Sequence, residues 1–502
     1  MLPSVVYLTV LVASSAALVF ELLAGTVASY LLGDTVTQLA TVTGVFLTCL
    51  GIGAWLSRHV TLRPADRFLH CQLASALTGG LSAPILFLAF ARTTLVQPIM
   101  YGLVGLTGVL TGAEIPLVLR VLRRRSSFRE LTSRMLTVDY AGALIGSLVF
   151  GLVALPQLGM VRAGVVAGLV SATCALWGTW AFGASLGEAA AVRARAVAVL
   201  LVLTVALLFS TKLSTLADDS VFSEPVVFAE RSLYQRIVVT RGHGGMNLFL
   251  DNNLQFSSVD EYRYHEALVH PAFAAAPRHA KVLVLGGGDG LAAREILKYP
   301  DVESVTLVDL DPAMTGLSRV VPWLAVLNHR SFDDPRVHVV NDDAMVWLAE
   351  SAAALGRFDI AVVDFPDPNN FALGKLYTAR FYKLLRARLA DDGVAVVQST
   401  SPLAARKSFW CVTRTLEAAG FVVRPYHALV PSFGEWGYTL VSSRPFAPFA
   451  PLPKGLSYLT DEILPQLFVL SPDMTAVPVE VNHLNNQVLV HYYEEEWRRY
   501  LH

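Results

Sequence analysis

Seven long apolar runs fill the first 213 residues, and they restrict the possible fold more than any other feature of the chain. An α-helix needs about 20 apolar residues to cross a bilayer. We therefore expect residues 1–214 to form a helical domain with about seven transmembrane helices. The runs cover approximately residues 5–32, 36–57, 71–91, 94–122, 138–156, 159–182 and 196–213.

The charges divide the chain into two parts. Residues 1–214 carry a net charge of +7 from 14 Lys and Arg against 7 Asp and Glu, whereas residues 215–502 carry −8 from 25 against 33. Only 16% of all residues are charged and the mean hydropathy is +0.51, which excludes a disordered chain. The acidic second part does not suit nucleic-acid phosphates, so we expect no nucleic-acid partner. The four cysteines show no CxxC spacing and predict no metal site.

Two acids interrupt the apolar runs, Glu21 in the first and Glu114 in the fourth. An ionisable residue inside a membrane span is a functional hypothesis by default. Two interpretations are open. Each acid hydrogen-bonds within the helix bundle, or the two belong to a cation path or an amine-binding site.

Most arginines of the first part lie in the loops on one side of the expected bundle. The loops on the other side contain only Arg92 and Arg162. Because cytoplasmic loops are enriched in Lys and Arg, the arginine-rich side is expected to be cytoplasmic. Seven spans would then place the second part of the chain outside. The arginines that follow the second and fourth runs or precede the seventh are Arg58, Arg63, Arg67, Arg120, Arg123, Arg124, Arg125, Arg129, Arg134, Arg193 and Arg195.

The second part begins with short strands and then alternates between strands and helices. Residues 224–258 indicate hairpins, which we assign to a small β subdomain over 215–275. The alternation that follows predicts a parallel, doubly wound sheet, and hence a Rossmann-like, methyltransferase-type domain over 276–445 with a tail over 446–502. Its strands are expected at 281–285, 303–309, 336–340, 358–364 and 393–398.

Glycines and acids follow these strands at the edge where such sheets bind ligands. The first strand ends in GGGDG (286–290), whose glycines allow a ligand to approach the backbone. The next strands are followed by Asp309, by Asp342 and Asp343, and by Asp364 and Asp367. A single acid there could cap a helix. Acids after four successive strands favour a site for a positively charged nucleoside, with Asp309 placed for ribose hydroxyls.

The order and spacing of several motifs resemble the spermidine synthases, or polyamine aminopropyltransferases, over about residues 220–445. The whole chain resembles the branch of that family with an amino-terminal multi-pass membrane domain. The motifs are Tyr234-Gln235, LDNNLQFSSVDEYRYHE (250–266), GGGDG with Arg294-Glu295, VDLD (308–311), VVDFPDP (362–368) and VPSFGEWGY (430–438).

The resemblance implies an enzyme of polyamine biosynthesis, a transferase that moves an aminopropyl group from decarboxylated S-adenosylmethionine to an amine such as putrescine. Methylthioadenosine leaves, and no metal or other cofactor is needed. It also implies a homodimer in a bacterial-type plasma (cell) membrane. Because the donor is made in the cytosol, the resemblance favours a cytoplasmic second part, which conflicts with the arginine distribution.

The resemblance also assigns roles to individual residues. Asp364 would be the catalytic residue that takes or orients the proton of the attacking amine. Asp289 would hold the ammonium group of the donor. The other donor-binding residues would be Gln235, Gln255, His265, Gly286, Gly288, Asp309, Asp342 and Asp343, and the acceptor-binding residues Tyr264, Asp367 and Phe433.

Departures from the family pattern leave the acceptor open. Asn252 replaces a glycine, Phe433 replaces an acceptor-side tyrosine, and Ser399 to Ser401 replace an acid that some relatives carry. Putrescine, a longer polyamine and another nucleophile are all compatible with this pattern. Two other functions are also considered. A methyltransferase is disfavoured because Asp289 would repel the carboxylate of its donor, and a sensor or transporter is supported only by the acids of the apolar runs.

Overall fold

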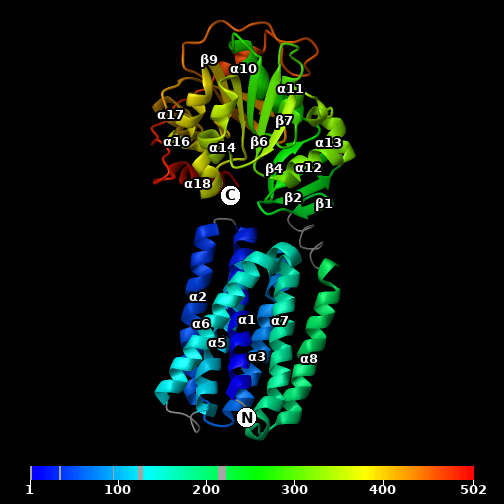
Figure 1. Cartoon of the computed structure of the whole chain (residues 1–502), viewed down its shortest axis with the longest axis vertical. Coiled ribbons are helices and arrows are strands. Elements are labelled where there is room, and N and C mark those ends of the chain that lie inside the picture. Colours follow the sequence, from blue (N-terminus) through cyan, green and yellow to red (C-terminus); the bar gives the residue numbers. More distant parts are fainter. Residues whose placement is uncertain are drawn as a thin grey trace. The chain divides into compact units, whose positions relative to one another are not determined.

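The computed structural model describes residues 3–32, 35–93, 95–122, 128–212, 222–242 and 244–501. The chain forms two compact units, a helical unit, Met1–Val226, and a sheet unit, Val227–His502 (Figure 1). The expected boundary at residue 214 lies outside the described residues, as do Arg123, Arg124 and Arg125.

The described part of the helical unit contains six helical stretches that are long and apolar enough to cross a membrane, the fifth spanning Arg129–Phe182. Leu81 separates the two helices of the third stretch, which together occupy the place of one expected span. The helices are α1 (Pro3–Leu32), α2 (Thr35–Leu56), α3 (Pro64–Gly80), α4 (Ser82–Arg92), α5 (Val96–Leu122), α6 (Phe128–Val149), α7 (Leu155–Phe182) and α8 (Ala189–Leu208).

The fifth stretch comprises α6 and α7, and α6 runs in the same direction as α1. A Cβ atom at Gly142 would lie 2.5 Å from the carbonyl oxygen of Leu11, and one at Gly146 would lie 2.3 Å from that of Ser15. Residue numbers therefore increase together along the two helices. The glycines permit this close approach, as small residues do between membrane helices.

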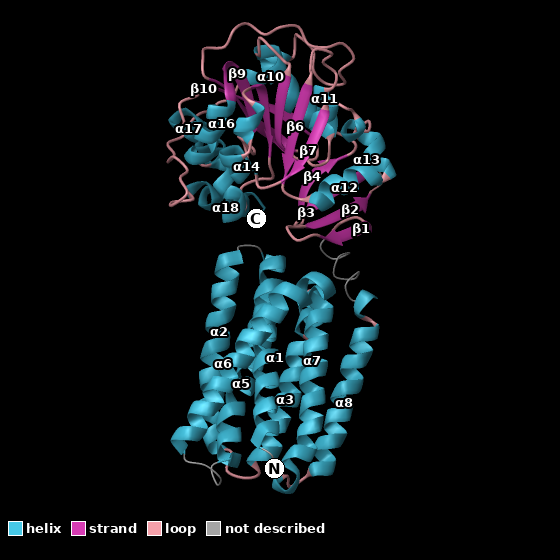
Figure 2. Cartoon of the chain, viewed as in Figure 1, coloured by secondary structure: helices cyan, strands magenta, loops and turns pink. Residues whose placement is uncertain are grey.

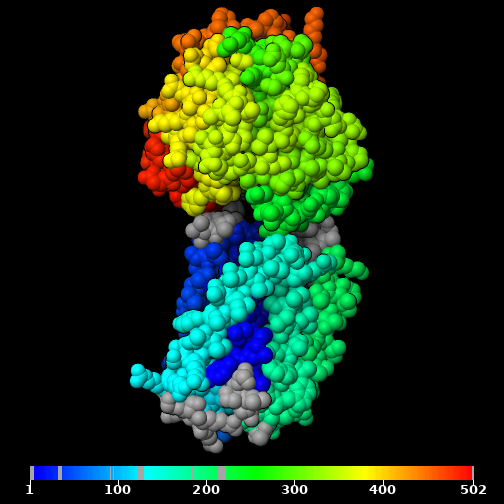
Figure 3. All heavy atoms as spheres, viewed as in Figure 1, coloured from blue at the N-terminus to red at the C-terminus, as the bar shows by residue number. Residues whose placement is uncertain are grey.

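Helix α7 runs in the opposite direction to α1. A Cβ atom at Gly164 would meet the side chain of Leu23 at 2.6 Å, whereas Cys174 lies ten residues further on at the hydroxyl of Thr9. The chain reverses near Gly159, whose φ of +71° is non-helical. Figure 3 shows dark-blue atoms of α1 recessed between α6 and α7. The six stretches therefore make seven passes through the bundle, in agreement with the seven apolar runs.

Several arginines of the described connections lie together at one end of the bundle, whereas Arg162 bonds to Ser210, just after α8. Arg63, before α3, pairs with Glu188, before α8. Arg120, near the end of α5, donates hydrogen bonds to the carbonyl oxygens of Ser57 and Val60, at 2.6 and 2.7 Å. After seven passes, the chain leaves α8 at the end of the bundle opposite these connections.

The sheet unit contains two sheets, with helices on both faces of the larger one (Figure 2). The smaller sheet has the order β1-β2-β3-β4, in which β2 with β3 and β3 with β4 are antiparallel, and it belongs to the sheet unit. Its strands are β1 (Val226–Arg231), β2 (Arg236–Arg241), β3 (Met246–Leu250) and β4 (Asn253–Ser257).

The larger sheet has the order β10-β11-β9-β8-β5-β6-β7, in which β7-β6-β5-β8-β9 are parallel and β11 pairs with β9 in antiparallel fashion. The expected strands are confirmed to within a few residues. The strands are β5 (Lys281–Gly286), β6 (Ser304–Asp309), β7 (Val337–Asn341), β8 (Phe358–Asp364), β9 (Leu389–Gln398), β10 (Val422–Val430) and β11 (Gly434–Ser442).

The central strand β5 determines where a ligand can bind. Its residues 282–285 are completely buried, because helices cover both faces of a parallel sheet. One core contains α10 and α11, and the other contains α14, α16 and α17. The chain order reverses between β5 and β8, which creates the crevice in which doubly wound sheets bind ligands. The helices are α10 (Glu261–Ala275), α11 (Leu291–Ile296), α12 (Pro312–Val320), α13 (Pro322–Leu327), α14 (Ala344–Glu350), α15 (Phe371–Gly374), α16 (Ala379–Arg388) and α17 (Arg406–Ala418).

The segment after residue 445 is an integral part of the sheet unit. Leu459 and Leu464 are buried in one of its cores. The buried amide of Asn482 donates hydrogen bonds to the carbonyl oxygens of Gly374 and Tyr377, both at 3.1 Å. The chain then forms α18 (Val488–Leu501), which packs against α17. The expected tail therefore helps to build the fold.

Candidate active site

The glycine-rich loop wraps closely around the ends of β6 and β8. Gly286 has a φ of +83°, and a Cβ atom there would lie 2.1 Å from the carbonyl oxygen of Asp364. At Gly288 a Cβ atom would lie 2.7 Å from Oδ2 of Asp309. Side chains at these positions would therefore displace both acids, which explains why glycine is required here.

Asp309 is held in place by backbone amides. Its carboxylate accepts hydrogen bonds from the amides of Gly288, at 3.1 Å, and Asp311, at 2.9 Å. Burial raises the pKa of Asp309 to about 6, and the charge of Asp311 contributes in the same direction. The side chain is therefore oriented before any ligand binds.

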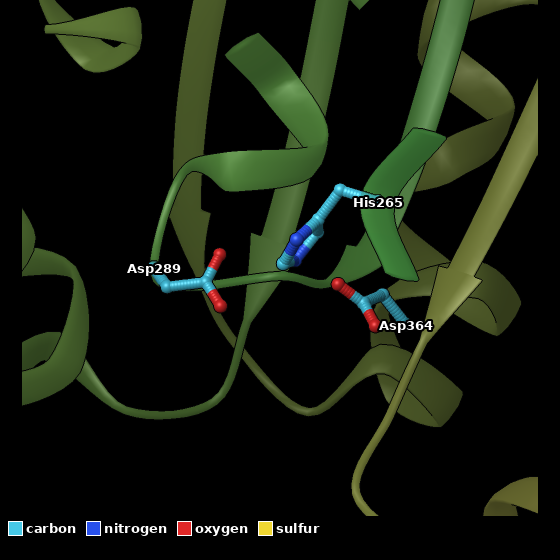
Figure 4. A group of neighbouring side chains, drawn as sticks. All are labelled: His265, Asp289 and Asp364. Atoms are coloured by element: carbon cyan, nitrogen blue, oxygen red, sulfur yellow. The ribbon is translucent and has the colours of Figure 1, made fainter. Parts of the chain in front are cut away.

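His265, Asp289 and Asp364 meet at the carboxyl edge of the sheet. One nitrogen or oxygen atom from each lies within 4.8 Å of the others. Figure 4 shows the imidazole of His265 between the two carboxylates. Asp289 is fixed by its Oδ1 atom, which accepts the amide of Leu291 at 2.9 Å. The three residues predicted separately from the sequence thus form one group.

Asp364 combines a raised pKa with a defined orientation. Its Oδ1 atom accepts a hydrogen bond of 2.7 Å from the hydroxyl of Tyr264, on α10. Burial and then the charge of Asp289 raise the pKa of Asp364 to about 6, although His265 and Tyr264 act in the opposite direction. The carboxylate is a stronger base than an ordinary aspartate and is still ionised near neutral pH.

A buried network of charges supports His265. Burial alone would lower the pKa of its imidazole, but the hydrogen bond and charge of Glu261, together with Asp289 and Asp364, raise it to about 9. Nδ1 of His265 lies 2.9 Å from Oε2 of Glu261. Arg294 in turn donates to both oxygens of Glu261, at 2.7 and 2.9 Å.

Glu261 and Arg294 lie within the motifs LDNNLQFSSVDEYRYHE and GGGDG with Arg294-Glu295, but their pairing was not predictable from the sequence pattern. The spacing of His265, Asp289 and Asp364 is compatible with a metal site. An imidazolium has no free lone pair for a metal, however, and the raised pKa of His265 favours that form. Two buried carboxylates in this arrangement can also hold an organic cation.

Asp367 lies in a second polar network beyond Asp364. Its carboxylate accepts hydrogen bonds from the amide of Gln398, at 2.9 Å, and the hydroxyl of Thr400, at 3.2 Å. Tyr493, on α18, donates a further hydrogen bond to it. Burial raises the pKa of Asp367 to about 6. Thr400 has a φ of +58°, a strained conformation for a β-branched residue, which places its side chain at Asp367.

Aromatic rings form one wall beside Asp364. The ring of Phe433 lies 6.0 Å from that of Tyr264 and 4.9 Å from that of Trp436. Phe433 therefore offers an apolar surface where a tyrosine would offer a hydroxyl.

The remaining predicted residues have partners within the protein. The amide of Gln235 donates to Asp311 at 2.9 Å, which places it at the loop after Asp309. The amide of Gln255 donates to the carbonyl oxygen of Asn253, on the same strand, at 3.1 Å. No described contact links either glutamine to His265, Asp289 or Asp364.

Asp342 and Asp343 follow β7. Asp343 caps α14 by accepting from the amide of Met345 at 2.9 Å, and Lys375 approaches it at 2.5 Å. Although burial alone would raise the pKa of Asp343, Lys375 holds it below its usual value. Asp342 accepts the amide of Asp343 at 2.7 Å. The capping interpretation is thus correct for Asp343.

The two acids of the apolar runs lie in the helical unit and hydrogen-bond within the bundle. Glu114 accepts from the hydroxyl of Ser75 at 3.2 Å, and Glu21 bonds to the hydroxyl of Thr43. Each acid also lines a cavity between the helices.

Comparison with known proteins gives a consistent result. Residues 261–448 match the family model of the spermine/spermidine synthase domain. The chain is 46% identical to the polyamine aminopropyltransferase of Leptospira interrogans, over 99% of both chains. It is 48% identical to polyamine aminopropyltransferase 2 of Ralstonia nicotianae, over 98% of this chain and 97% of that one.

A crystal structure of spermidine synthase in complex with the transition-state analogue AdoDATO also matches, at 28% identity. The match covers 49% of this chain and 85% of the chain in the crystal structure, with a TM-score of 0.46. The curated relatives match along almost the whole length at well over 30% identity, across both units. The chain belongs to the polyamine aminopropyltransferase family.

Proposed function

We propose that the sheet unit transfers an aminopropyl group from decarboxylated S-adenosylmethionine to a primary amine, with Asp364 as the base. The observation that carries this proposal is the pair of carboxylates, Asp289 and Asp364, at the switch point of the sheet. The lone pair of the amine attacks the carbon next to the sulfonium. The carbon–sulfur bond breaks, and its electrons neutralise the sulfur of the departing methylthioadenosine.

The acceptor must lose a proton before it can attack, because an ammonium has no lone pair. Asp364 is suited to take this proton, since its pKa of about 6 keeps it ionised near neutral pH and raises its basicity. Tyr264 would keep the carboxylate aimed at the acceptor. In this proposal, Asp289 attracts the ammonium of the donor and so positions the reacting carbon.

The donor would lie along the glycine-rich loop. Asp309 would accept hydrogen bonds from the ribose hydroxyls. The amide of Gly288 already donates to its carboxylate and so orients it for this role. The backbone at Gly286 and Gly288 leaves room for the nucleoside. We place the adenine near Asp342 and Asp343, although Lys375 already pairs with Asp343. Gln235, Gln255 and His265 complete the proposed donor side.

The acceptor would lie between Phe433, Tyr264 and Asp367. A diamine has an apolar chain with a cation at each end, which fits an aromatic wall followed by a buried carboxylate. The residues after β9 supply no further acid here: the hydroxyl of Thr400 donates to Asp367, and that of Ser399 donates to the carbonyl oxygen of Val397. This favours an acceptor with one distal ammonium, such as putrescine, over a longer and more highly charged polyamine.

We also propose that the helical unit spans the plasma membrane, and that the protein forms a homodimer through its sheet units, as the family resemblance implies. The opposite courses of α6 and α7 support seven passes, and the arginine-rich connections then favour a sheet unit on the non-cytoplasmic side. The opposing argument is the cytosolic origin of the donor. A reporter fused after residue 502 that is active only in the cytoplasm would refute this orientation, and light scattering in detergent would test the dimer.

The reaction can be tested with the purified full chain in detergent. Methylthioadenosine release should require both the donor and a diamine, and putrescine should be a better acceptor than spermidine. Donor binding without release, for every amine tried, would contradict the proposal and favour a protein that only binds its ligands.

A further inference from the structure

A cavity lined by two carboxyl groups lies in the helical unit. Helices α1, α2, α3, α5 and α6 line this cavity, whose volume of about 70 Å³ is room for about two water molecules at liquid density. Most of its wall is apolar, and four polar side chains face it. The apolar lining residues are Val10, Ala13, Leu50, Phe68 and Ile115, and the polar ones are Ser14, Thr111, Glu114 and Asp139.

Among the described residues, the lining of the cavity contains two carboxyl groups and no basic side chain. Glu114 is only 5% exposed, and one of its oxygens accepts from the hydroxyl of Ser75. One oxygen of Asp139 accepts from the hydroxyl of Ser14 at 2.5 Å. Each of these bonds occupies one carboxyl oxygen, and carboxyl groups inside a membrane domain require a cation or protons as partners.

An unpartnered hydroxyl provides independent support. Oγ1 of Thr111 is buried and has no hydrogen-bond partner, although Thr111 lines the cavity. One turn earlier on the same helix, Thr107 bonds to the carbonyl oxygen of Leu103 at 2.9 Å, as threonine commonly does in helices. The hydroxyl of Thr111 is therefore left available to a ligand in the cavity.

We propose that this cavity binds the primary ammonium end of an aliphatic amine. A primary ammonium has three hydrogen-bond donors and no acceptor. Glu114, Asp139 and Thr111 offer three acceptors, and the apolar wall suits the attached methylene groups. Ca²⁺ takes six to eight oxygen ligands, more than this lining supplies, and Zn²⁺ prefers the Cys and His ligands that the described lining lacks.

The cavity at Glu21 provides a matched control. Its volume is only about 10 Å³, room for about one water molecule. Glu21 is also a buried carboxyl group of the same unit, only 7% exposed. Replacing Glu21 removes one carboxyl group from the bundle, as replacing Glu114 does. It removes no side chain of the proposed amine-binding cavity.

The test is equilibrium dialysis of radiolabelled putrescine with the full chain in detergent. Asp364→Asn/Asp367→Asn removes the proposed acceptor site of the sheet unit, and we expect about one bound diamine per chain to remain. Adding Glu114→Gln/Asp139→Asn should weaken this binding at least tenfold, whereas adding Glu21→Gln should not change it. The proposal fails if the first variant binds no putrescine, or if the Glu114 and Asp139 substitutions leave binding unchanged.

Two further measurements test the proposal even if the variant with Glu114→Gln and Asp139→Asn does not fold. Thr111→Val keeps the charge and shape of the site, and the loss of one hydrogen bond should weaken binding about fivefold. Butylammonium should displace putrescine, whereas tetramethylammonium, which has no N–H donor, should not. Unchanged affinity in Thr111→Val, or equal displacement by the two cations, would overturn the proposal.

Discussion

The two units place buried carboxyl groups in very different surroundings. In the sheet unit, Asp289 and Asp364 lie beside the imidazole of His265, whose pKa is raised to about 9, and Arg294 pairs with Glu261 behind it. In the described part of the helical unit, Glu21 bonds to the hydroxyl of Thr43 and Glu114 to that of Ser75, and the described lining of their cavities contains no basic residue. The difference separates acids with internal counter-charges, which are arranged for chemistry, from acids that depend on a cation or proton from outside.

Removing the internal counter-charge should have the largest effect. Arg294→Met removes the guanidinium that pairs with both Glu261 and Glu295, and losing one partner of a buried ion pair typically costs about 3–5 kcal/mol. Of the described ion pairs, Glu261 then keeps only that with His265, whereas Glu295 keeps those with Lys298 and His270. We expect the melting temperature of the sheet unit, measured by scanning calorimetry, to fall by roughly 10 °C. Arg414→Met breaks only an exposed ion pair with Glu417 and should change it by less than about 2 °C. Equal falls in melting temperature in the two variants would show that the buried counter-charge stabilises the sheet unit no more than an exposed ion pair does.

The carboxylate pair should reduce stability in the absence of substrates. The pKa of Asp364 is raised to about 6 in the folded protein, so folding disfavours its charged form. This cost is present when the pH is above about 6 and disappears as the pH falls below the unfolded value of about 4. Asp364→Asn should therefore raise the melting temperature by a few degrees at pH 7.5, and by less at pH 5. A lower melting temperature at pH 7.5 would contradict this account of the pair.

The same pKa values predict how activity depends on pH. A base must be deprotonated, so kcat/KM should fall about tenfold per pH unit below pH 6 as Asp364 is protonated. Asp367 and Asp309, with similar pKa values of about 6, can make the fall steeper. A profile that stays flat down to pH 4.5, measured by methylthioadenosine release, would exclude Asp364 as the base.

The carboxyl-terminal helix should affect the acceptor more than the donor. Tyr493→Phe removes one hydrogen bond to Asp367, worth about 1 kcal/mol, and should raise the KM for putrescine about fivefold. The KM for the donor should change by less than twofold. Trp497→Phe, one turn further along α18, is a matched control and should change neither value. An effect of Tyr493→Phe on the donor alone would place the acceptor elsewhere.

The smallest effect is expected in the helical unit. Glu21→Gln lies in the other unit and should leave methylthioadenosine release in detergent within about twofold of the unaltered chain. A loss of more than tenfold, in protein of unchanged melting temperature, would show that the two groups of acids do not act separately.

Much of the architecture could be predicted from local patterns. Long apolar runs and alternating strands and helices depend on neighbouring residues, and the reversal at Gly159 agrees with the break between the fifth and sixth runs. The carboxyl edge of the sheet was predictable for the same reason, because parallel strands bring their ends together. The acids at Asp289, Asp309 and Asp364 therefore lie where the sequence indicated.

The contacts that the pattern did not reveal are long-range side-chain contacts. Arg294 meets Glu261 across 33 residues, and Tyr493 reaches Asp367 from a helix 126 positions later in the chain. Helix capping at Asp343 and the pairing of Gln235 with Asp311 also depend on how loops pack. No local period records such pairings, so the predicted roles of these residues require direct measurement.

The central claim is that Asp364 removes the proton of an amine acceptor for aminopropyl transfer. The most direct measurement compares methylthioadenosine release by the full chain and by Asp364→Asn, with putrescine and saturating donor. We predict a loss of turnover of about 10²–10⁴-fold in Asp364→Asn, with donor binding retained. Turnover within tenfold of the unaltered chain, in correctly folded variant protein, would contradict the claim.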